Sequence, residues 1–236
     1  MKFFLDTANL EDLQKYASWG TFSGVTVNPV LLVKETIDYE THTRKMLKIL
    51  PPDWEISLEV RSGKAEEMVA QGRILSSWDT RVRVKIPTTV EGLRCASILA
   101  KEVPLNMTVI KSAAQAMLCQ AMAIRLDAKD VVISVFCDRL RQAGQDWHEI
   151  FRSISQRPWK GKVLAASIKT PTDLAEAITL GAEIVTAPPD VYEMALSSSL
   201  VNDDVKTFDD AFDVRGLHLP GEKPLRVVAR DGRDTA

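Results

Sequence analysis

The chain alternates between short runs of β-branched and apolar residues and longer stretches with helical spacing. Eight such runs stand at residues 3–6, 24–27, 56–60, 82–86, 105–109, 131–136, 163–167 and 183–187. Successive runs begin 20 to 32 residues apart, which leaves room for one crossover helix in every gap. This rhythm is typical of parallel βαβ units and predicts eight strands, each followed by helix.

The stretch before the last run shows how the sequence marks the ends of a helix. Residues 172–182 have amphipathic spacing, Pro171 stands near the first turn, and Gly181 follows the last turn. Thr170 and Thr172 are the two candidates for the N-cap, because a threonine hydroxyl can accept a hydrogen bond from the first turn. We therefore expect a helix between the seventh and eighth strands.

Eight β/α repeats in 236 residues predict an α/β protein with a single (β/α)8 TIM barrel and a C-terminal helical extension. A doubly wound open sheet is the alternative. An open sheet with right-handed crossovers would bury both faces of its strands and give nearly continuous apolar runs. Most runs here instead place a polar or small residue near the carboxyl end, which favours the barrel.

These polar residues share one position, the end of a predicted strand. They are Asp6, Thr26 with Asn28, Glu59, Lys85, Thr108, Ser134 and Ser167. In a barrel, inward positions at the carboxyl ends converge on one mouth, where active sites of this fold are built. Any one of them also fits a residue that begins a turn. Seven strands that each supply such a group indicate an active site.

Residues 80–87 alternate between apolar and basic side chains, with Arg83 and Lys85 on the basic face. The pattern fits an edge strand with a solvated basic face, which is a common protection against aggregation. In a closed barrel, however, the apolar face meets the helices and Lys85 points into the mouth. Lys85 is then a candidate nucleophile.

Schiff-base chemistry by a lysine needs a neutral amine. A lysine of ordinary pKa, near 10.4, holds only about 0.04% of its amine in that form at neutral pH. Desolvation or a neighbouring cation raises this fraction. Partial burial at a barrel mouth would supply the desolvation. Arg83, two residues earlier on the same face, could add to it or could pair with a buried carboxylate.

Composition narrows the classes of partner. The 30 Lys and Arg residues against 32 Asp and Glu residues give a formal net charge of -2, so no global field favours nucleic acid or an anionic membrane. Three cysteines without a C-x-x-C pair make a disulfide framework or a zinc ribbon a poor fit. The acidic amino terminus lacks a signal-peptide pattern, and we expect a cytoplasmic protein.

Several longer motifs carry a resemblance to a known family. They are FFLDTAN (3–9), GVTVNP (24–29), SLEV (57–60), VKIPTTVEGL (84–93), the T-x6-Q pattern of residues 108–115, and KVLAASIKTP (162–171). Through them the chain resembles the transaldolase family over residues 1 to about 213. It is most similar to the short-chain subfamily, which also contains the fructose-6-phosphate aldolases.

The resemblance implies a class I aldol mechanism that needs no metal or organic cofactor. Lys85 would form a Schiff base with the keto carbon of a ketose phosphate, and cleavage would leave an enamine of dihydroxyacetone on the enzyme. The enamine would then add to an acceptor aldose phosphate. Asp6 would be the acid/base for the C4 hydroxyl, while Glu59 and Thr108 would hold the water that relays protons.

The resemblance also implies the residues that bind substrate. Asn28, with Thr26 beside it, would orient the three-carbon unit, and Ser134 would bind a donor hydroxyl. Arg139 and Ser167 would take the phosphate, a role that suits a guanidinium because it can bind phosphate through two hydrogen bonds. A solvated arginine at a helix start is the alternative for Arg139.

Two positions distinguish the branches of the family. Members that release free dihydroxyacetone resemble one another in carrying an amide where Glu59 stands and a tyrosine where Phe136 stands. The carboxylate and phenyl ring of this chain are typical of transfer enzymes, so we predict transfer. The alternatives are a fructose-6-phosphate aldolase and a barrel that binds sugar phosphate without turning it over.

Some residues depart from the family pattern. Val27 and Val30 replace the second threonine and the serine of the usual G-V-T-T-N-P-S motif. Asp138 stands beside Arg139, where a carboxylate pointing inward would oppose a phosphate dianion. It could instead tether the arginine or face solvent. The acceptor, or the charged end of the donor, is therefore open.

The predicted organisation is a barrel over residues 1–190, helix over 191–214 and a tail over 215–236. By resemblance the chain forms a homo-oligomer, a pentamer or a decamer, in which the terminal helix crosses to a neighbouring subunit. Phe208 and Phe212 would anchor that contact. The alternative is a helix folded back on its own barrel. The tail, rich in charge, proline and glycine, is expected to be mobile or to wrap on a partner subunit.

Overall fold

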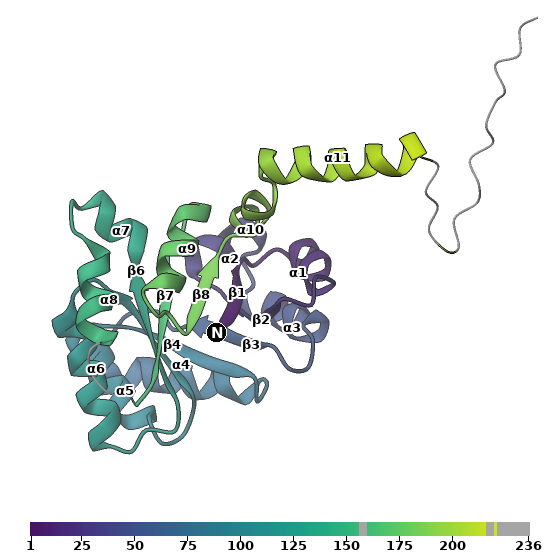
Figure 1. The fold of residues 1–236 in the computed structure, drawn as a ribbon. Helices are drawn as coiled ribbons and strands as arrows, with labels where there is room; N and C mark the ends of the chain where they lie inside the picture. The colour runs from purple at the N-terminus through teal and green to yellow at the C-terminus, as the bar shows by residue number, and fades with distance from the viewer. Residues whose placement is uncertain (156–159, 216–219, 221–236) are drawn as a thin grey trace, which may run out of the picture. The chain divides into compact units, whose positions relative to one another are not determined.

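A computed structural model describes residues 1–155, 160–215 and 220 of the chain. Its centre is a closed barrel of parallel strands in sequential order, β1 to β8, drawn in Figure 1. The strands are β1 (Lys2–Asp6), β2 (Phe22–Thr26), β3 (Glu55–Glu59), β4 (Val82–Pro87), β5 (Leu105–Ile110), β6 (Val131–Phe136), β7 (Lys162–Ala166) and β8 (Ile184–Ala187). The predicted (β/α)8 barrel is confirmed, and a closed sheet excludes both the open sheet and the edge strand at residues 80–87.

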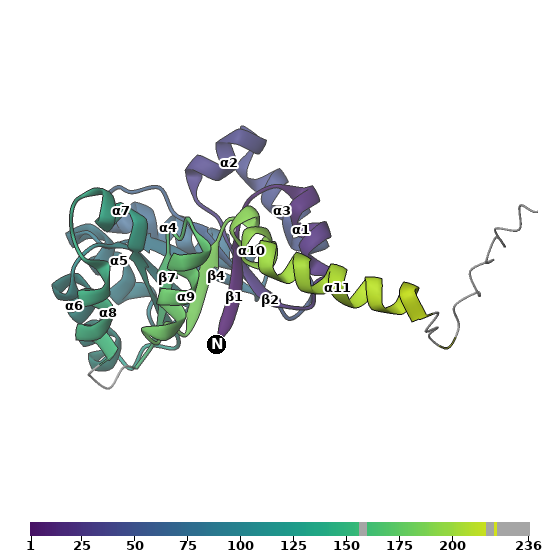
Figure 2. The same ribbon diagram turned by 45° about the horizontal axis from the view of Figure 1, so that its top comes forward.

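Helices follow the strands, and those that connect one strand to the next surround the barrel, as two views of the ribbon show (Figures 1 and 2). The described helices are α1 (Leu10–Ala17), α2 (Pro29–Glu35), α3 (Tyr39–Ile49), α4 (Ala65–Ser77), α5 (Val90–Leu99), α6 (Ala113–Arg125), α7 (Cys137–Gln142), α8 (Trp147–Ser155), α9 (Pro171–Thr179), α10 (Pro189–Leu196) and α11 (Ser199–Arg215). In the described part of the chain, none of them is both long and apolar enough to cross a membrane.

Contacts divide the chain into two compact units, Met1–Ala195 and Leu196–Ala236. The first contains the barrel. The second contains α11, and the helical pattern predicted over 191–214 is therefore split between α10 and α11. The tail predicted over 215–236 lies almost entirely outside the described residues.

Side chains that point outward from the strands make the main core. Leu5, Val25, Leu58 and Ile86 are among those fully buried between the barrel and its helices. Inside the barrel, Phe4 packs with residues of β6, β7 and β8 in a separate, smaller apolar cluster. Most other inward positions are polar, which explains why the strand sequences alternate where a doubly wound sheet would be apolar throughout.

Arg83 closes the amino-terminal end of the barrel. Its guanidinium lies 2.7 Å from Glu55 and 2.5 Å from Asp130, and Lys2 reaches the same Glu55 at 2.5 Å. Arg83 is only 3% exposed, and two carboxylates balance the two cations. Of the two roles left open by the sequence, the structure shows pairing with carboxylates, although these are only partly buried.

The helix before β8 begins at Thr170. The Thr170 hydroxyl accepts a hydrogen bond from the Asp173 amide at 3.1 Å, and the Asp173 carboxylate accepts one from the Thr170 amide at 3.2 Å. This reciprocal capping box, with Pro171 in the first turn, fixes the start of α9. Gly181 ends the segment with a positive φ of 87°, a conformation that favours glycine.

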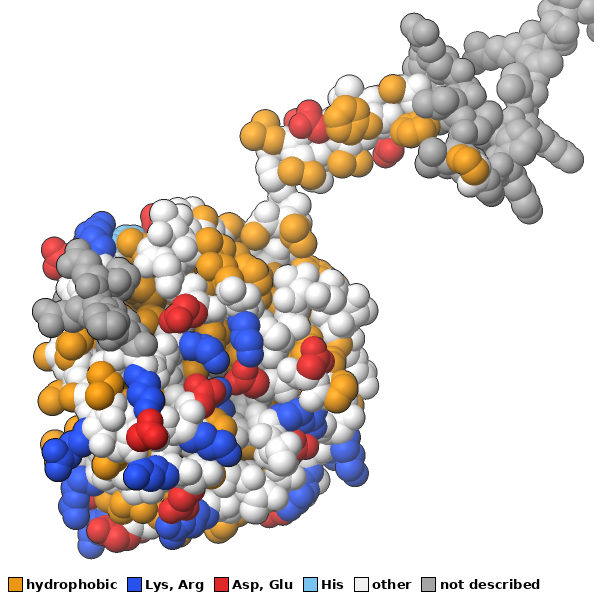
Figure 3. Space-filling model, turned by 60° about the horizontal axis from the view of Figure 1, so that its bottom comes forward, with side chains coloured by type: hydrophobic (Ala, Val, Ile, Leu, Met, Phe, Trp, Pro, Cys, Tyr) orange, Lys and Arg blue, Asp and Glu red, His pale blue; other side chains and the backbone are white. Residues whose placement is uncertain are grey.

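The visible face of the space-filling model carries lysines and arginines interspersed with aspartates and glutamates (Figure 3). Neither sign of charge forms a continuous patch on that face. The distribution agrees with the nearly balanced charge of the sequence.

Candidate active site

Lys85 and Glu59 form a buried ion pair at the carboxyl end of the barrel. They are opposite each other in the register of β3 and β4, and Lys85 Nζ lies 2.9 Å from Glu59 Oε2. The amine also donates to the Val27 carbonyl at 3.4 Å, and Lys85 is only 4% exposed. The amine therefore faces the interior, within proton-transfer distance of a carboxylate.

Asp6 ends β1 and is linked to two threonines. Thr26 Oγ1 donates to Asp6 Oδ1 at 2.8 Å, and Thr26 Oγ1 lies 2.7 Å from Thr186 Oγ1. Burial raises the pKa of Asp6 above its usual range, although the charges of Lys85 and Lys169 and the Thr26 hydrogen bond act in the opposite direction. Asp6 is thus a carboxyl group whose surroundings make its protonated form easier to reach.

Thr108 lies on β5 with a buried hydroxyl. Among the described residues this hydroxyl has no hydrogen-bond partner. The next residue, Val109, has a φ of +61°, which is strained for a β-branched side chain, and the register of β5 with β6 shifts there. A buried, unpaired hydroxyl is a costly arrangement that a bound polar group would relieve.

Ser134 belongs to a polar layer that crosses the barrel. Its hydroxyl donates to Asn106 Oδ1 at 2.7 Å, and Asn106 Nδ2 donates to Ser57 Oγ at 3.1 Å. Asn106 is also opposite Lys85 in the register of β4 and β5. All three members of this layer are buried.

The sequence reading missed Asn106, Ser57 and Thr186 because it considered only the last polar residue of each strand. Inward side chains repeat every second residue. Asn106 is two residues before Thr108, and Ser57 is two before Glu59. Continuing the period of two down each strand would have found both.

Asn28 follows β2 and is the N-cap of α2. Its Oδ1 accepts a hydrogen bond from the Leu31 amide at 3.1 Å. Any contact of Asn28 with a substrate oxygen would therefore use its amide N–H groups. Pro29 at the first helical position reinforces this start.

Arg139 lies on α7, and Ser167 directly follows β7. The two segments are joined by a 3.2 Å hydrogen bond from the Asp138 amide to the Ser167 carbonyl. Gln142 links the two charged residues, since it donates to Asp138 at 2.7 Å and accepts from Arg139 at 3.4 Å. Asp138 thus tethers Arg139 indirectly, which is one of the arrangements that the sequence left open.

Phe136 is the last residue of β6 and precedes α7. Its ring is partly buried against the apolar cluster inside the barrel, which includes Phe4 of β1 and Leu164 of β7. The phenyl ring therefore borders the interior of the barrel, two strands away from β4, which carries Lys85. It has no polar group with which to hold water.

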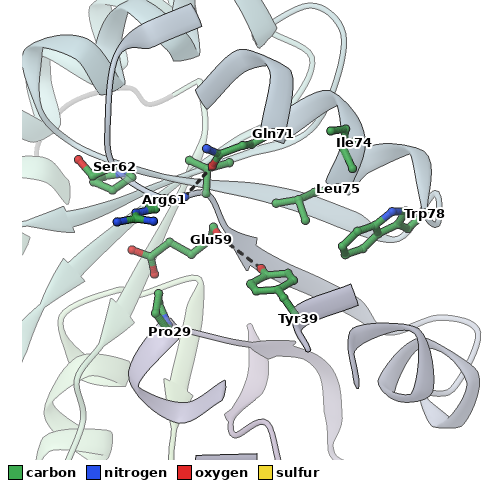
Figure 4. A pocket seen from close by; sticks show the side chains of 11 residues that line it. Pro29, Tyr39, Glu59, Arg61, Ser62, Gln71, Ile74, Leu75 and Trp78 are labelled. Carbon is green, nitrogen blue, oxygen red and sulfur yellow. Dashed lines mark hydrogen bonds between the residues drawn. The ribbon is translucent and has the colours of Figure 1, made fainter. Parts of the chain in front are cut away.

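A cavity of about 610 Å³ adjoins Glu59 on the helix side of β3. Tyr39, Leu75 and Trp78 line it, and the Glu59 carboxylate points away from the Trp78 end (Figure 4). The Tyr39 hydroxyl donates to the Glu59 carbonyl at 3.3 Å, and burial raises the pKa of Tyr39 above its ordinary value. This contact fixes the backbone of Glu59 on the helix side of β3.

Comparison with solved structures finds enzymes with a similar fold. 3-Hexulose-6-phosphate synthase from Salmonella typhimurium superposes with a TM-score of 0.54 and 15% identity, over 80% of this chain and 89% of that one. Inosine 5′-monophosphate dehydrogenase from Legionella pneumophila gives 0.55 and 11%, over 81% and 58%. At these identities the likeness shows the shared barrel fold alone.

Sequence comparison is more specific. Two proteins described as probable transaldolases, from Symbiobacterium thermophilum and Caldicellulosiruptor saccharolyticus, are each 38% identical to this chain, over 88% of it and 95% of their own length. The family model for Transaldolase/Fructose-6-phosphate aldolase matches residues 3–215. The chain belongs to the Transaldolase/Fructose-6-phosphate aldolase family, and it is an enzyme of the class that transfers ketone and aldehyde groups.

Proposed function

We propose that this enzyme is a class I transaldolase, which moves a dihydroxyacetone unit from a ketose phosphate such as fructose 6-phosphate to an aldose phosphate. The observation that carries the proposal is the buried Lys85 amine, 2.9 Å from the Glu59 carboxylate at the barrel mouth. A nucleophile and a proton-transfer group in contact are what imine formation requires.

Imine formation begins when a proton passes from the Lys85 ammonium to Glu59. The neutral amine attacks the C2 carbonyl, and one proton moves from the nitrogen to the oxygen to give the carbinolamine. Glu59 then returns its proton to the new hydroxyl, which leaves as water. The Thr108 hydroxyl, buried without a partner among the described residues, is suited to hold that water. The carbonyl oxygen leaves as water and C2 becomes an iminium carbon bonded to Lys85.

Cleavage then needs a base for the C4 hydroxyl, and we assign this role to Asp6. When Asp6 takes that proton, the C3–C4 bond breaks and its electron pair moves into the iminium, giving an enamine. The aldose phosphate leaves with its new carbonyl group. Transfer is the reverse with a second aldose, whose oxygen receives the proton from Asp6.

The remaining residues position the substrate in this proposal. Arg139 and Ser167 bind the phosphate, and Lys169, close enough to Asp6 to lower its pKa, adds a cation at the same mouth. Asn28 and Thr26 orient the three-carbon unit, and Ser134 binds a donor hydroxyl. Holding the phosphate places the carbonyl carbon near the amine and replaces a chance encounter by a positioned one.

The Glu59 carboxylate and the Phe136 ring support transfer over simple cleavage. A phenyl ring cannot deliver solvent protons to the enamine, so the enamine survives until an aldose arrives. The second candidates are a fructose-6-phosphate aldolase and a barrel that binds without turnover. A cytoplasmic location and a homo-oligomer, pentamer or decamer, with α11 packed on a neighbouring subunit, belong to the same proposal and rest on the resemblance.

The experiment supplies fructose 6-phosphate with and without a panel of aldose phosphates and identifies the products by mass spectrometry. We expect new ketose phosphates with acceptor and little free dihydroxyacetone without it. Equal release of dihydroxyacetone in both cases would show an aldolase, and absence of any product would leave only a binding protein.

The variant Glu59→Gln sharpens this test. An amide keeps the size of the side chain but cannot carry the proton, so transfer should fall by about 10²-fold while the share of free dihydroxyacetone rises. Glu66→Gln is the matched control, because the Glu66 side chain is 71% exposed and has no role in the proposed reaction. An unchanged product ratio in Glu59→Gln would contradict the assignment.

A further inference from the structure

Thr186 contacts a residue of the candidate site but has no role in the proposed reaction. It lies on β8, while Thr26 lies on β2, and both strands pair with β1, which carries Asp6. The hydrogen bond between the two threonine hydroxyls therefore passes over β1 inside the barrel. Each threonine is only 2% exposed.

The packing beneath this chain of oxygens is tight. Phe4 lies two residues before Asp6 on the same inward face, and its ring occupies the space above Gly24. A Cβ at Gly24 would be 2.7 Å from the ring. Below the hydroxyls of Thr26 and Thr186 lies the apolar ring of Phe4, which offers no hydrogen bond. The two hydroxyls therefore bond to each other.

The number of available protons decides which hydroxyl donates in each of these hydrogen bonds. Each hydroxyl has one proton to donate. When Asp6 is ionised, the Thr26 hydroxyl donates its single proton to Asp6 Oδ1 at 2.8 Å. In the 2.7 Å contact between the two hydroxyls, Thr26 must therefore accept the hydrogen bond from Thr186. Thr186 is therefore the donor, and the sequence of donation runs from Thr186 through Thr26 to the carboxylate.

We propose that Thr186 is a positioning residue that acts through Thr26 to stabilise the ionised form of Asp6, the form that accepts the C4 proton. A hydroxyl that accepts a hydrogen bond becomes a stronger donor in turn, so loss of the Thr186 bond weakens the bond to Asp6. The inference rests on the proposed role of Asp6 and deepens it.

Other groups around Asp6 act on the same equilibrium. Burial favours the protonated form, while Lys85 from β4 and Lys169 from the segment after β7 favour the ionised form. Tyr192 of α10 is near enough to feel the charge of Asp6, but its hydroxyl donates to the Phe4 carbonyl at 2.8 Å, and burial keeps it neutral by raising its pKa. None of these contacts involves Thr186, so its effect can be separated from theirs by substitution.

The test compares pH profiles of kcat/KM for fructose 6-phosphate cleavage in the presence of an acceptor. Thr186→Val keeps the shape but removes the donor, and the acidic limb should move upward by about half a pH unit. Thr186→Ser, which restores the hydroxyl, should return the limb to the wild-type position. Thr43→Val is the matched control, because Thr43 is a buried threonine of α3 whose hydroxyl has no hydrogen-bond partner among the described residues.

A double variant tests whether the effect passes through Thr26. Thr26→Val removes the direct donor and should shift the limb further than Thr186→Val. Adding Thr186→Val to it should then shift nothing more. If Thr186→Val does not fold, Thr186→Cys, with a weak thiol donor, takes its place with the same expected direction.

A second readout separates this inference from the proposed function. Borohydride trapping with dihydroxyacetone as the probe needs Lys85 but no C–C cleavage, so Thr186→Val should give an adduct within twofold of wild type. A wild-type protein that forms no adduct would contradict the proposed function. Normal trapping with superimposed profiles of wild type and Thr186→Val would overturn the role of Thr186, as would an equal shift in Thr186→Ser or in Thr43→Val.

Discussion

At the residue scale, the candidate site contains two carboxyl groups, Glu59 and Asp6, with different surroundings. Glu59 contacts the Lys85 ammonium directly and can take its proton over a 2.9 Å contact. Asp6 stands at the end of β1, and burial raises its pKa. In the proposed mechanism these two carboxyl groups, in different surroundings, serve different steps: Glu59 serves the imine and Asp6 the C–C bond.

The raised pKa of Asp6 predicts a cost in stability. A carboxyl whose pKa is higher in the folded than in the unfolded protein binds more protons when folded, so stability falls as the pH rises through these values. Asp6→Asn removes a buried charge and should raise the melting temperature at pH 7 by about 2–4 °C for each kcal/mol relieved. Activity should be lost.

Thermal melts at several pH values check this prediction. The advantage of Asp6→Asn over wild type should shrink as the pH falls toward the pKa of Asp6, where the wild-type carboxyl becomes neutral. A variant that is less stable than wild type at pH 7, or an advantage that does not vary with pH, would show that the Asp6 charge is not strained by burial.

At the element scale, strand alternation places the chemistry. Lys85, Glu59 and Thr108 all face inward because inward and outward positions alternate along β3, β4 and β5. The register places Glu59 level with Lys85, and Thr108 lies two residues beyond the partner of Lys85 on β5. Pairing of Glu59 with Lys85 needs no loop to hold it. This arrangement explains why residues far apart in the chain form a rigid group.

The same alternation decided what the sequence could predict. All eight strands were recognised, because β-branched runs at regular intervals are a strong signal. Asn106 and Thr186 were missed, since a polar residue in the middle of a run looks like noise until closure of the sheet turns it inward. The linkage of Asp138 to Arg139 through Gln142 depends on side-chain conformations that no pattern encodes.

The cap of α9 gives a prediction for a single element. Thr170→Ala removes the hydroxyl of the capping box and should cost about 1 kcal/mol, or roughly 2–4 °C in melting temperature. Thr172→Ala, at the other candidate position, is the control and should change little, because Thr172 is exposed and is not the N-cap. Equal losses in both variants would argue against the observed boundary.

At the scale of the whole molecule, the barrel interior is divided along its axis. Arg83 closes the amino-terminal end with Glu55, Asp130 and Lys2, and Lys85, the proposed nucleophile, lies two residues further along the same strand. In this account one end of the cylinder serves stability and the other serves chemistry. This is the usual division in barrels of this fold.

Removal of Arg83 should therefore affect folding more than chemistry. Arg83→Met leaves two carboxylates without their partner and should destabilise the protein by about 3 kcal/mol, the lower part of the range for buried pairs because both carboxylates are partly exposed. The melting temperature should fall by roughly 6–12 °C. Below that temperature, trapping of a donor on Lys85 should stay near the wild-type level.

The acid dependence checks the same network. Burial acts to raise the pKa of Glu55, but Lys2 and Arg83 outweigh it and the pKa is lowered. Stability from this pair is present above the unfolded pKa and is lost as the pH falls through the folded one. Arg83→Met should lack this part of the acid loss. Unchanged stability with lost trapping would indicate a catalytic Arg83.

The central claim, that Lys85 is the nucleophile, is tested most directly by reducing the protein with borohydride in the presence of fructose 6-phosphate and mapping the peptides by mass spectrometry. The account predicts a three-carbon dihydroxyacetone adduct on the peptide that contains Lys85, and none in a folded Lys85→Arg variant. An adduct on another lysine, or activity that survives in Lys85→Arg, would contradict it.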